Sequence, residues 1–303
     1  MNFKGEFRYN EPMANHTTFK VGGPADIWVK PEAGCFPDYA SSLLQAAKIE
    51  GIPVFVLGAG ANLVVSDKGI RGIVLDTSGW TGLEPSAEDS AWDSLVFRTG
   101  TSVDDAIETA ARLSLSGLEF LAGMPGTIGG AVWMNARCYE KSISDALLET
   151  EILDEGFSRQ KIPFNNDDFG YKKSPFQNRG VLILRASFRL KKGDLNLIKQ
   201  EMEAHIQDRK EKGHYRFPSA GSAFKNNRAF GEPTGKIIDT LGLRGFSMGG
   251  AQVAPWHGNI IINTGNAAAS DIRALAEEVT RRVKAERGFD LEPEILFVGD
   301  WDV

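Results

Sequence analysis

Short apolar runs bounded by glycines mark the first half of the chain. Residues 53–57 and 73–76 are rich in β-branched and aromatic side chains, and we expect both to form strands. Residues 181–190 instead alternate between apolar and polar positions, which predicts a half-buried strand in an antiparallel or mixed sheet. The glycine-rich segment between the first two strands is then a turn rather than part of a regular element.

Three other segments have helical periodicity. After Ser102, the apolar positions 103, 106, 107, 110 and 111 share one face, Ser102 and Asp105 have capping spacing, and Gly117 is expected to end the helix. A strongly charged helical block follows at about 195–212, and the Pro-Ser-Ala-Gly stretch at 218–221 is interpreted as a domain junction. The clearest helix begins at Ser270, with Asp271 in its first turn and an apolar stripe that runs to Gly288. The patterns together predict a compact α+β chain.

Length and composition restrict the class of protein. A chain of 303 residues corresponds to about two domains, and three small ones are also compatible. With 42% hydrophobic and 24% charged residues and no apolar run of about 18, the chain is neither disordered nor expected to insert in a membrane. No apolar stretch follows the first positive charge, so a cytoplasmic location is the default expectation.

Charge, cysteine and histidine content argue against several kinds of site. The net charge of −6 disfavours a surface that coats nucleic acid, although it leaves room for a local basic pocket. Cys35 and Cys138 are too few for a disulfide framework, and with four scattered histidines they do not suggest a metal centre. We therefore expect no metal and no nucleic-acid partner.

Glycine is in excess, at 33 of 303 residues, or about 11% against a usual 7%. The turn Gly58-Ala59-Gly60-Ala61-Asn62 follows a predicted strand, but Leu63 occupies the third glycine position of a dinucleotide motif and no helix pattern follows. Successive turn amides can still bind a pyrophosphate. A tight turn that simply needs positive φ is the alternative interpretation.

A second cluster, Gly123-Met124-Pro125-Gly126-Thr127-Ile128-Gly129-Gly130, has four glycines within eight residues. Glycine costs about 0.5–1 kcal/mol relative to alanine in regular structure, so such a cluster suggests that a ligand is approached by bare backbone. Two separate backbone cradles suit a flavin dinucleotide better than a mononucleotide.

These motifs resemble a known family when they are taken in order. Residues 15–25, 58–67 and 117–130 are similar to the FAD domain of the UDP-N-acetylenolpyruvoylglucosamine reductase (MurB) family. Pro-Ser-Ala-Gly-Ser-Ala-Phe-Lys-Asn at 218–226, Gly-Gly-Ala-Gln-Val at 249–253 and Leu-Glu-Pro-Glu at 291–294 resemble its substrate-domain motifs. The short spacing after Ser174 resembles the compact subclass, which lacks the βαββ insertion and tyrosine loop.

The resemblance implies a fold and an activity. The fold is α+β, a vanillyl-alcohol-oxidase-like (PCMH-type) FAD-binding fold of two lobes plus a third α+β substrate-binding domain. Its parts are lobe 1 at 1–77 with 290–303 returning to it, lobe 2 at 78–200, and the substrate-binding domain at 201–289. The implied enzyme is a cytoplasmic monomer of peptidoglycan precursor synthesis. It binds FAD noncovalently, uses NADPH as co-substrate, and converts UDP-N-acetylglucosamine enolpyruvate to UDP-N-acetylmuramate.

The resemblance also assigns roles to residues. Ser222 matches the proton donor, Glu294 the carboxylate beside the enolpyruvyl group, and Lys172 the cation that stabilises the enolate. The residues that match the flavin-binding motifs are Gly58, Ala59, Gly60, Ala61, Asn62, Leu63, Pro125, Gly126, Thr127, Gly129, Gly130 and Asn135. Those that match substrate-binding positions are Tyr171, Lys225, Asn226, Gln252 and His257.

Four positions depart from the family pattern. The string Gly-Tyr-Lys-Lys-Ser at 170–174 has Lys172 where the family has arginine, which keeps the charge but loses the planar fork. Leu296 replaces a second arginine, and Lys173 is a candidate to compensate. Asn-Ala-Arg-Cys-Tyr at 135–139 differs from the usual Asn-Ala-Gly-Ala-Tyr, which puts the flavin contacts beyond Asn135 in question. His16 is expected to pack or assist rather than to attach the flavin.

Two alternatives remain open at this point. One is another oxidoreductase of the same FAD fold, for example an oxidase, although the substrate-domain motifs would then be unexplained. The other is a flavin or nucleotide-sugar binding protein whose turnover was lost or weakened with the arginine.

Overall fold

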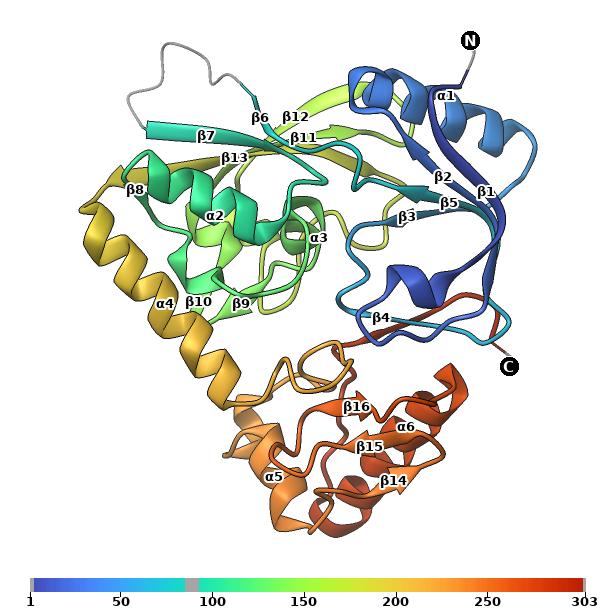
Figure 1. The fold of residues 1–303 in the computed structure, drawn as a ribbon, viewed down its shortest axis with the longest axis vertical. Helices are drawn as coiled ribbons and strands as arrows, with labels where there is room; N and C mark the ends of the chain where they lie inside the picture. Colours follow the sequence, from blue (N-terminus) through green and yellow to red (C-terminus); the bar gives the residue numbers. More distant parts are fainter. Residues whose placement is uncertain (1–2, 85–92, 302–303) are drawn as a thin grey trace. The chain divides into compact units, whose positions relative to one another are not determined.

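The computed structural model of the protein describes residues 3–84 and 93–301, and Figure 1 labels their helices and strands. The chain divides into two compact units. Unit 1 comprises residues up to 8 together with 28–59 and 74–208, and unit 2 comprises 9–27, 60–73 and 209 onward. The division into three parts expected from the family resemblance is a finer one and stays a prediction.

A four-stranded sheet has the order β1-β2-β5-β3, formed by Gly5–Pro12, Pro24–Pro31, Ile70–Asp76 and Val54–Leu57. Helix α1, Phe36–Ile49, connects β2 to β3. The strands predicted at 53–57 and 73–76 are therefore confirmed, and the second begins three residues earlier than its apolar run suggested.

Unit 1 contains a larger antiparallel sheet. Its strand order is β12-β11-β13-β7-β6, with β8 also paired to β13; the bounds are Arg159–Pro163, Leu147–Leu153, Leu182–Lys192, Asp93–Arg98, Leu83–Glu84 and Leu115–Ser116. The alternating segment at 181–190 is thus a strand with antiparallel neighbours, as predicted. Its apolar side is buried at Leu182, Leu184, Ala186, Phe188 and Leu190.

Helices α2, Val103–Arg112, and α3, Ile128–Trp133, pack on one side of this sheet (Figure 1) and share its hydrophobic core. The predicted capping of α2 is confirmed, because the Ser102 hydroxyl accepts a 3.0 Å hydrogen bond from the Asp105 N–H. The expected end at Gly117 is wrong. The helix stops at Arg112 because Ser114 takes a left-handed conformation, φ 55°, and the next two residues pair with β13 as β8.

The remaining elements of unit 1 are short except for α4, which continues into unit 2. The hairpin β9 and β10, Arg137–Cys138 and Lys141–Ser142, follows α3, and α4 covers Leu195–Glu211. The charged block at about 195–212 is therefore a helix, as predicted.

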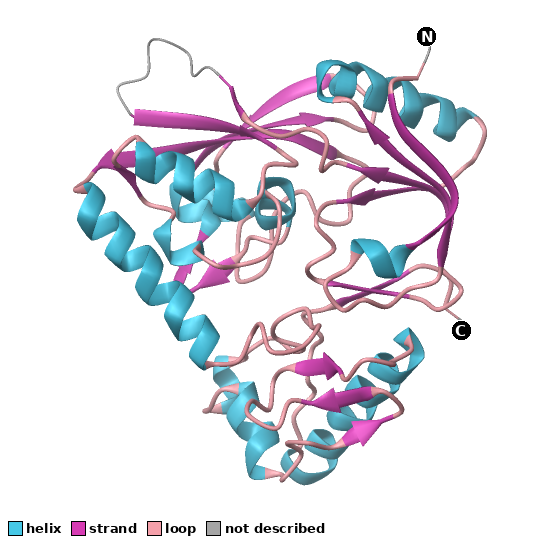
Figure 2. Ribbon diagram, in the orientation of Figure 1, coloured by secondary structure: helices cyan, strands magenta, loops and turns pink. Residues whose placement is uncertain are grey.

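Unit 2 contains a three-stranded antiparallel sheet, β14-β15-β16, made of Ser247–Met248, Ala251–Val253 and Ile261–Asn263. Helices α5, Thr234–Thr240, and α6, Ala269–Arg287, share a hydrophobic core with this sheet (Figure 2). The apolar stripe of α6 is fully buried, and Gly288 ends the helix with φ 72°, as the pattern predicted.

Unit 2 also contains a pair of parallel strands. The parallel pair β4 and β17, Leu63–Val65 and Leu296–Val298, joins the segment after the first glycine turn to the C-terminal segment. Unit 2 has a hydrophobic core of its own, which includes α5, α6 and this pair. Within the described residues, no helix is both long and apolar enough to cross a membrane.

Candidate functional site

The first glycine motif forms a turn between two strands. Strand β3 ends at Leu57 and β4 begins at Leu63, so no helix follows, in agreement with the sequence prediction. Gly60 has φ 61°, and a Cβ placed on it would lie 2.0 Å from the carbonyl oxygen of His16. This position therefore tolerates only glycine, for reasons of both conformation and space.

Within the part of the chain that the structure describes, the backbone amides of this turn are not used by the protein's own acceptors. Among the described residues, the N–H groups of Gly58, Ala59, Gly60 and Ala61 have no hydrogen-bond acceptor in the protein. A series of such amides in one turn forms a concave anion-binding nest. The turn fits the pyrophosphate of a dinucleotide, which would satisfy these donors.

The second glycine motif opens α3, whose N-cap is Thr127. The N–H groups of Ile128 and Gly129 donate to the carbonyl oxygens of Thr101 and Thr99, both at 2.8 Å, so this helix end is held by protein partners. A Cβ on Gly129 would lie 1.7 Å from the hydroxyl oxygen of Thr99. Gly129 therefore serves close backbone packing, whereas a Cβ on Gly126 would find no atom nearer than 3.9 Å.

Unit 1 brings parts of the two glycine motifs together. A Cβ on Gly58 would lie 2.8 Å from the hydroxyl oxygen of Thr127. Glycine at 58 thus lets the start of the first turn touch the N-terminus of α3, although the two are separated by 69 positions in the sequence. The contact therefore brings the start of the first glycine motif against the N-cap of the second.

The turn that carries Lys172 is tied to the other end of α3. Gly170 and Lys173 exchange two backbone hydrogen bonds of 3.0 and 3.1 Å, and Lys172 takes a left-handed φ of 56°. The side chain of Asn135 donates to the Gly170 carbonyl at 2.8 Å, and that of Gln177 donates to the Lys172 carbonyl at 3.2 Å. Asn135 therefore supports the turn, and its assignment to flavin binding stays a prediction.

Gln177 is a residue that the sequence analysis did not select. Its side-chain amide also donates to the Trp133 carbonyl at 3.1 Å, and the hydroxyl of Ser174 donates to the same oxygen at 2.6 Å. The turn is thereby fixed to the C-terminus of α3. No local pattern marks Gln177, because its partners lie 5 and 44 positions away.

In unit 2 the predicted catalytic residues Ser222 and Glu294 lie on neighbouring backbone segments. Ser222 forms an isolated bridge with Ile260, and the N–H of Glu294 donates a 2.8 Å hydrogen bond to the carbonyl of Ala223. Ser222 is half-buried, and its hydroxyl has no hydrogen-bond partner among the described residues. Sequence-distant segments are therefore paired at the residue that follows Ser222.

Glu294 is also linked to the first glycine turn. The side-chain amide of Asn62 donates to the Glu294 carbonyl at 2.9 Å, and the Leu296 N–H donates to the Asn62 carbonyl at 2.9 Å. Leu296, where the family has arginine, lies in β17 opposite Leu63. Asn62, a predicted flavin-binding residue, thus also holds the backbone of residues 294–296 in place.

The predicted substrate-binding residues of unit 2 have internal partners. The Lys225 ammonium pairs with the Glu292 carboxylate at 2.5 Å. The side-chain oxygen of Asn226 accepts from the Thr234 N–H at 2.9 Å, and the Gln252 amide donates to the Gly245 carbonyl at 3.1 Å. Tyr171 lies in unit 1, where its side chain is 44% exposed.

His257 occupies a half-buried turn beside α5. Its Nδ1 accepts a 3.1 Å hydrogen bond from the N–H of Asn259, which is compatible with a neutral ring. Burial lowers the pKa of His257 below its ordinary value; Asp239 opposes this change, and Arg244 and Lys212 reinforce it. At neutral pH the side chain is therefore an uncharged hydrogen-bonding group.

His16 and Arg137 each contact a nearby carboxylate. His16 makes a 2.9 Å contact with the carboxylate of Glu11, both partly buried, which agrees with the expected packing role. Arg137, at the family's glycine position, contacts Glu140 at 2.7 Å. Among the described residues, no group of three or more His, Cys, Asp or Glu side chains is placed to hold a metal ion.

Comparison with known proteins assigns the chain. Residues 37–156 match the model of the FAD binding domain, and residues 213–298 match that of the UDP-N-acetylenolpyruvoylglucosamine reductase C-terminal domain. The chain is 42% identical to the UDP-N-acetylenolpyruvoylglucosamine reductase of Treponema denticola, over 98% of this chain and 95% of that protein. It is 39% identical to the enzyme of the same name from Borreliella burgdorferi, over 95% and 93%.

A solved structure agrees with these relatives. The crystal structure of UDP-N-acetylenolpyruvylglucosamine reductase (MurB) from Thermus caldophilus superposes with a TM-score of 0.77 at 31% identity, covering 98% of this chain and 99% of that one. The expected fold and FAD cofactor are confirmed. From the full-length similarity and the two matched domains, the chain belongs to the UDP-N-acetylenolpyruvoylglucosamine reductase family.

Proposed function

We propose that the protein is an FAD-dependent, NADPH-using reductase that converts UDP-N-acetylglucosamine enolpyruvate to UDP-N-acetylmuramate for peptidoglycan synthesis. Membership of the reductase family at about 40% identity over nearly the whole chain supports this activity. The observation that best supports the chemistry is the hydrogen bond from the Glu294 N–H to the carbonyl of Ala223, the residue after Ser222. This bond pairs the two segments of unit 2 that contain the predicted catalytic residues.

The flavin supplies the redox chemistry: when bound, it accepts hydride from NADPH and delivers hydride to the methylene carbon of the enolpyruvyl group. The protein must then stabilise negative charge on the carbon next to the substrate carboxylate and supply a proton there. Such electrostatic stabilisation is usually the largest contribution to this type of catalysis. The proposed cation is Lys172, with Lys173 as a candidate to compensate, and the proposed proton donor is Ser222.

Each proposed catalytic residue has a separate task. Lys172 stabilises the enolate as a point charge, since an ammonium lacks the planar fork of arginine. Ser222 donates its hydroxyl proton to the carbanionic carbon. Glu294 polarises the enolpyruvyl group or assists proton delivery, which suits a carboxylate on the segment paired beside Ser222.

The binding residues follow from the same proposal. The amides of the 58–62 turn hold the FAD pyrophosphate, and the segment of Pro125, Gly126, Thr127 and Gly130 lies against the cofactor. Tyr171, Lys225, Asn226, Gln252 and His257 contact the UDP-sugar. Lys225 pairs with Glu292 in this structure, so diphosphate binding would require Lys225 to exchange that carboxylate for a phosphate.

We further propose the division into three parts, with lobe 1 at 1–77 and 290–303, lobe 2 at 78–200 and the substrate-binding domain at 201–289. The parallel pairing of β17 with β4 supports the return of the C-terminal segment to lobe 1. A cytoplasmic monomer is the form in which we expect the enzyme to act.

An anaerobic half-reaction experiment tests the function. NADPH should bleach the visible flavin absorption of the purified protein, and UDP-N-acetylglucosamine enolpyruvate added afterwards should restore it with formation of the muramate product. A flavin that stays bleached would favour the binding-protein alternative. Rapid oxygen consumption with an alcohol would favour an oxidase of the same fold.

A further inference from the structure

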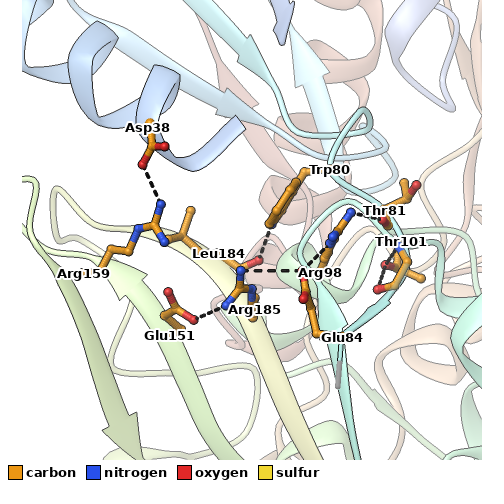
Figure 3. Close-up of polar contacts among 11 residues, drawn as sticks. Asp38, Trp80, Thr81, Glu84, Arg98, Thr101, Glu151, Arg159, Leu184 and Arg185 are labelled. Atoms are coloured by element: carbon orange, nitrogen blue, oxygen red, sulfur yellow. Dashed lines mark hydrogen bonds and ion pairs between the residues drawn. The ribbon is translucent and has the colours of Figure 1, made fainter. Parts of the chain in front are cut away.

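The side chain of Trp80 lies where several segments of unit 1 meet. Its indole is 5% exposed, stacks on Phe36 of α1 with ring centroids 5.7 Å apart, and carries the Arg98 guanidinium 4.0 Å from its centroid. Its indole N–H donates a 3.1 Å hydrogen bond to the carbonyl of Leu184 in β13 (Figure 3). One residue therefore contacts α1, β7 and β13 at once.

On one side, Trp80 is connected to the first glycine turn. The Trp80 N–H donates to the carbonyl of Thr77 at 2.9 Å. The N–H and the hydroxyl of Thr77, which is buried, both donate to the carbonyl of Leu57 at 2.9 Å. Leu57 is the last residue of β3, directly before Gly58. The hydrogen bonds from Trp80 to Thr77 and from Thr77 to Leu57 therefore fix the position at which the turn begins.

On the other side, Trp80 is connected to the second glycine motif. The Leu184 carbonyl that accepts from the indole also accepts from the N–H of Thr99 at 2.9 Å. The carbonyl of Thr99 in turn accepts from the N–H of Gly129 at 2.8 Å, and the carbonyl of Trp80 accepts from Gly100 at 2.9 Å. The Thr99 backbone therefore joins Trp80 directly to the first turn of α3.

An ion-pair group holds the exposed side of this arrangement. Arg98 donates to the Glu84 carboxylate at 2.5 Å and to the Thr81 carbonyl at 3.1 Å. Arg185 contacts the same Glu84 at 3.5 Å and Glu151 at 2.9 Å, as Figure 3 shows. Bridging by one carboxylate restricts both guanidiniums, so Arg98 remains over the indole. A cation over tryptophan adds attraction beyond simple packing.

We infer that Trp80 is a positioning residue for FAD: it aligns the two glycine motifs so that both present backbone to one cofactor. The reason is geometric. Backbone hydrogen bonds hold each motif in place, and Trp80 takes part in both groups of bonds. Its backbone N–H binds Thr77 on the side of the first motif, and its indole N–H binds the Leu184 carbonyl on the side of the second. The inference rests on the proposed function only in that FAD is the ligand, and it adds a residue that makes no contact with the reacting atoms.

Release of FAD tests the inference. Trp80→Phe keeps an aromatic ring against Phe36 but removes the N–H donor to Leu184. The holoenzyme of this variant is diluted, and free flavin is followed by its fluorescence at a temperature where circular dichroism shows the protein folded. We expect the FAD dissociation constant to rise about fivefold, the net contribution of one hydrogen bond, and the flavin absorption band to change shape.

Trp28→Phe is the matched control. Trp28 is 2% exposed in the same unit and lies under Arg8, but it takes no part in the hydrogen bonds that connect Trp80 to Leu57 and to Gly129. Its FAD affinity should stay at the wild-type value. A Trp80→Phe protein that melts earlier but holds FAD as tightly as the wild type would overturn the inference, as would equal weakening by Trp28→Phe.

Arg98→Met provides a second test should Trp80→Phe not fold. It removes the nearer of the two guanidiniums over the indole, from a partly exposed position; Arg185 stays 5.7 Å from the ring centroid and keeps its contact with Glu84. We expect FAD release to increase about twofold; unchanged release would contradict the inference. Failure of the proposed function can be distinguished from failure of this inference. If the wild-type protein binds FAD but does not turn over the sugar substrate, the FAD affinities of the variants can still be measured and compared.

Discussion

The side-chain amide of Asn62 donates a 2.9 Å hydrogen bond to the backbone carbonyl of Glu294. These residues are 232 positions apart, and the contact joins the glycine turn proposed to hold FAD to the backbone of the residue whose carboxylate is proposed to act on the substrate. Together with the hydrogen bond from Leu296 to the Asn62 carbonyl, it fixes the start of β17 against that turn. A change on either side is therefore expected to affect the other.

Asn62→Asp tests this connection. The variant has nearly the same shape but presents oxygens to the Glu294 carbonyl, so a hydrogen bond is replaced by repulsion. We expect a loss of about 1–3 kcal/mol in the free energy of unfolding, measured by urea denaturation. The second half-reaction should also slow. Stability and reoxidation rate equal to those of the wild type would show that the contact has no role in either.

Ser222→Ala separates the two half-reactions. Because the proposed role of Ser222 begins after hydride reaches the substrate, the variant should still lose its flavin absorption on addition of NADPH. Product formation should fall by about 10²–10⁴-fold, the usual contribution of a general acid, as measured by anaerobic stopped-flow spectroscopy. Ser219→Ala, the same change three residues upstream, serves as control and should leave both steps intact. Equal loss in both half-reactions would contradict the assignment.

Lys172→Met tests the cation that replaces the family arginine. Removal of one charge that stabilises the enolate is expected to lower the rate of the second half-reaction by about 10²–10³-fold, with NADPH oxidation unaffected. Lys172→Arg should retain activity. Lys173→Met in the adjacent exposed position distinguishes the two lysines: unchanged turnover would remove Lys173 as a compensating residue, and a large loss would transfer the role to it.

Gln177→Ala tests the support of the same turn. It removes the donors to the carbonyls of Lys172 and Trp133 without altering the charge of Lys172. Lys172 has a left-handed backbone, which is costly for a residue with a Cβ and needs such support. We expect kcat of the second half-reaction to fall with little change in the KM for NADPH. Partial recovery in Gln177→Asn is not expected, since the shorter side chain does not span both carbonyls.

Acid should destabilise the protein partly through His257. Its pKa in the folded state lies below the ordinary 6.5, so in the unfolded state it binds a proton first as the pH falls. The associated stability is complete above pH 6.5 and declines as the pH drops from there toward the folded-state pKa. His257→Gln should show a smaller decrease in melting temperature across this window. Parallel pH profiles for the two proteins would exclude His257 as a contributor.

Asp67 shows how a distant residue completes a helix. The N-cap of α6 is Ala268, which has no capping side chain, and the carboxylate of Asp67 accepts from the N–H groups of Ala269 and Ser270 at 2.7 and 2.9 Å. Asp67→Ala should cost about 0.5–2 kcal/mol in the free energy of unfolding. Asp67→Asn, which keeps one oxygen acceptor, should lose less.

Local patterns alone were sufficient for most regular elements. The apolar stripes of α2 and α6, the alternation in β13 and the lack of a helix after Leu63 are all readable because each depends on the periodicity of one segment. Ser102 was likewise identified as a cap since its partner lies three residues away. The ordered motifs then indicated the family and its FAD cofactor.

The contacts that build the candidate site depended on tertiary structure. Gly129 looked like a ligand-facing glycine, yet its hydrogen atom is needed to pack against Thr99. No local pattern marks the contacts of Gln177 with Trp133, of Asp67 with α6 or of Trp80 with Leu184, because each joins segments that are far apart along the chain. Sequence periodicity reports which side of an element is apolar, whereas the close approach of two backbones is decided only when the elements pack against one another.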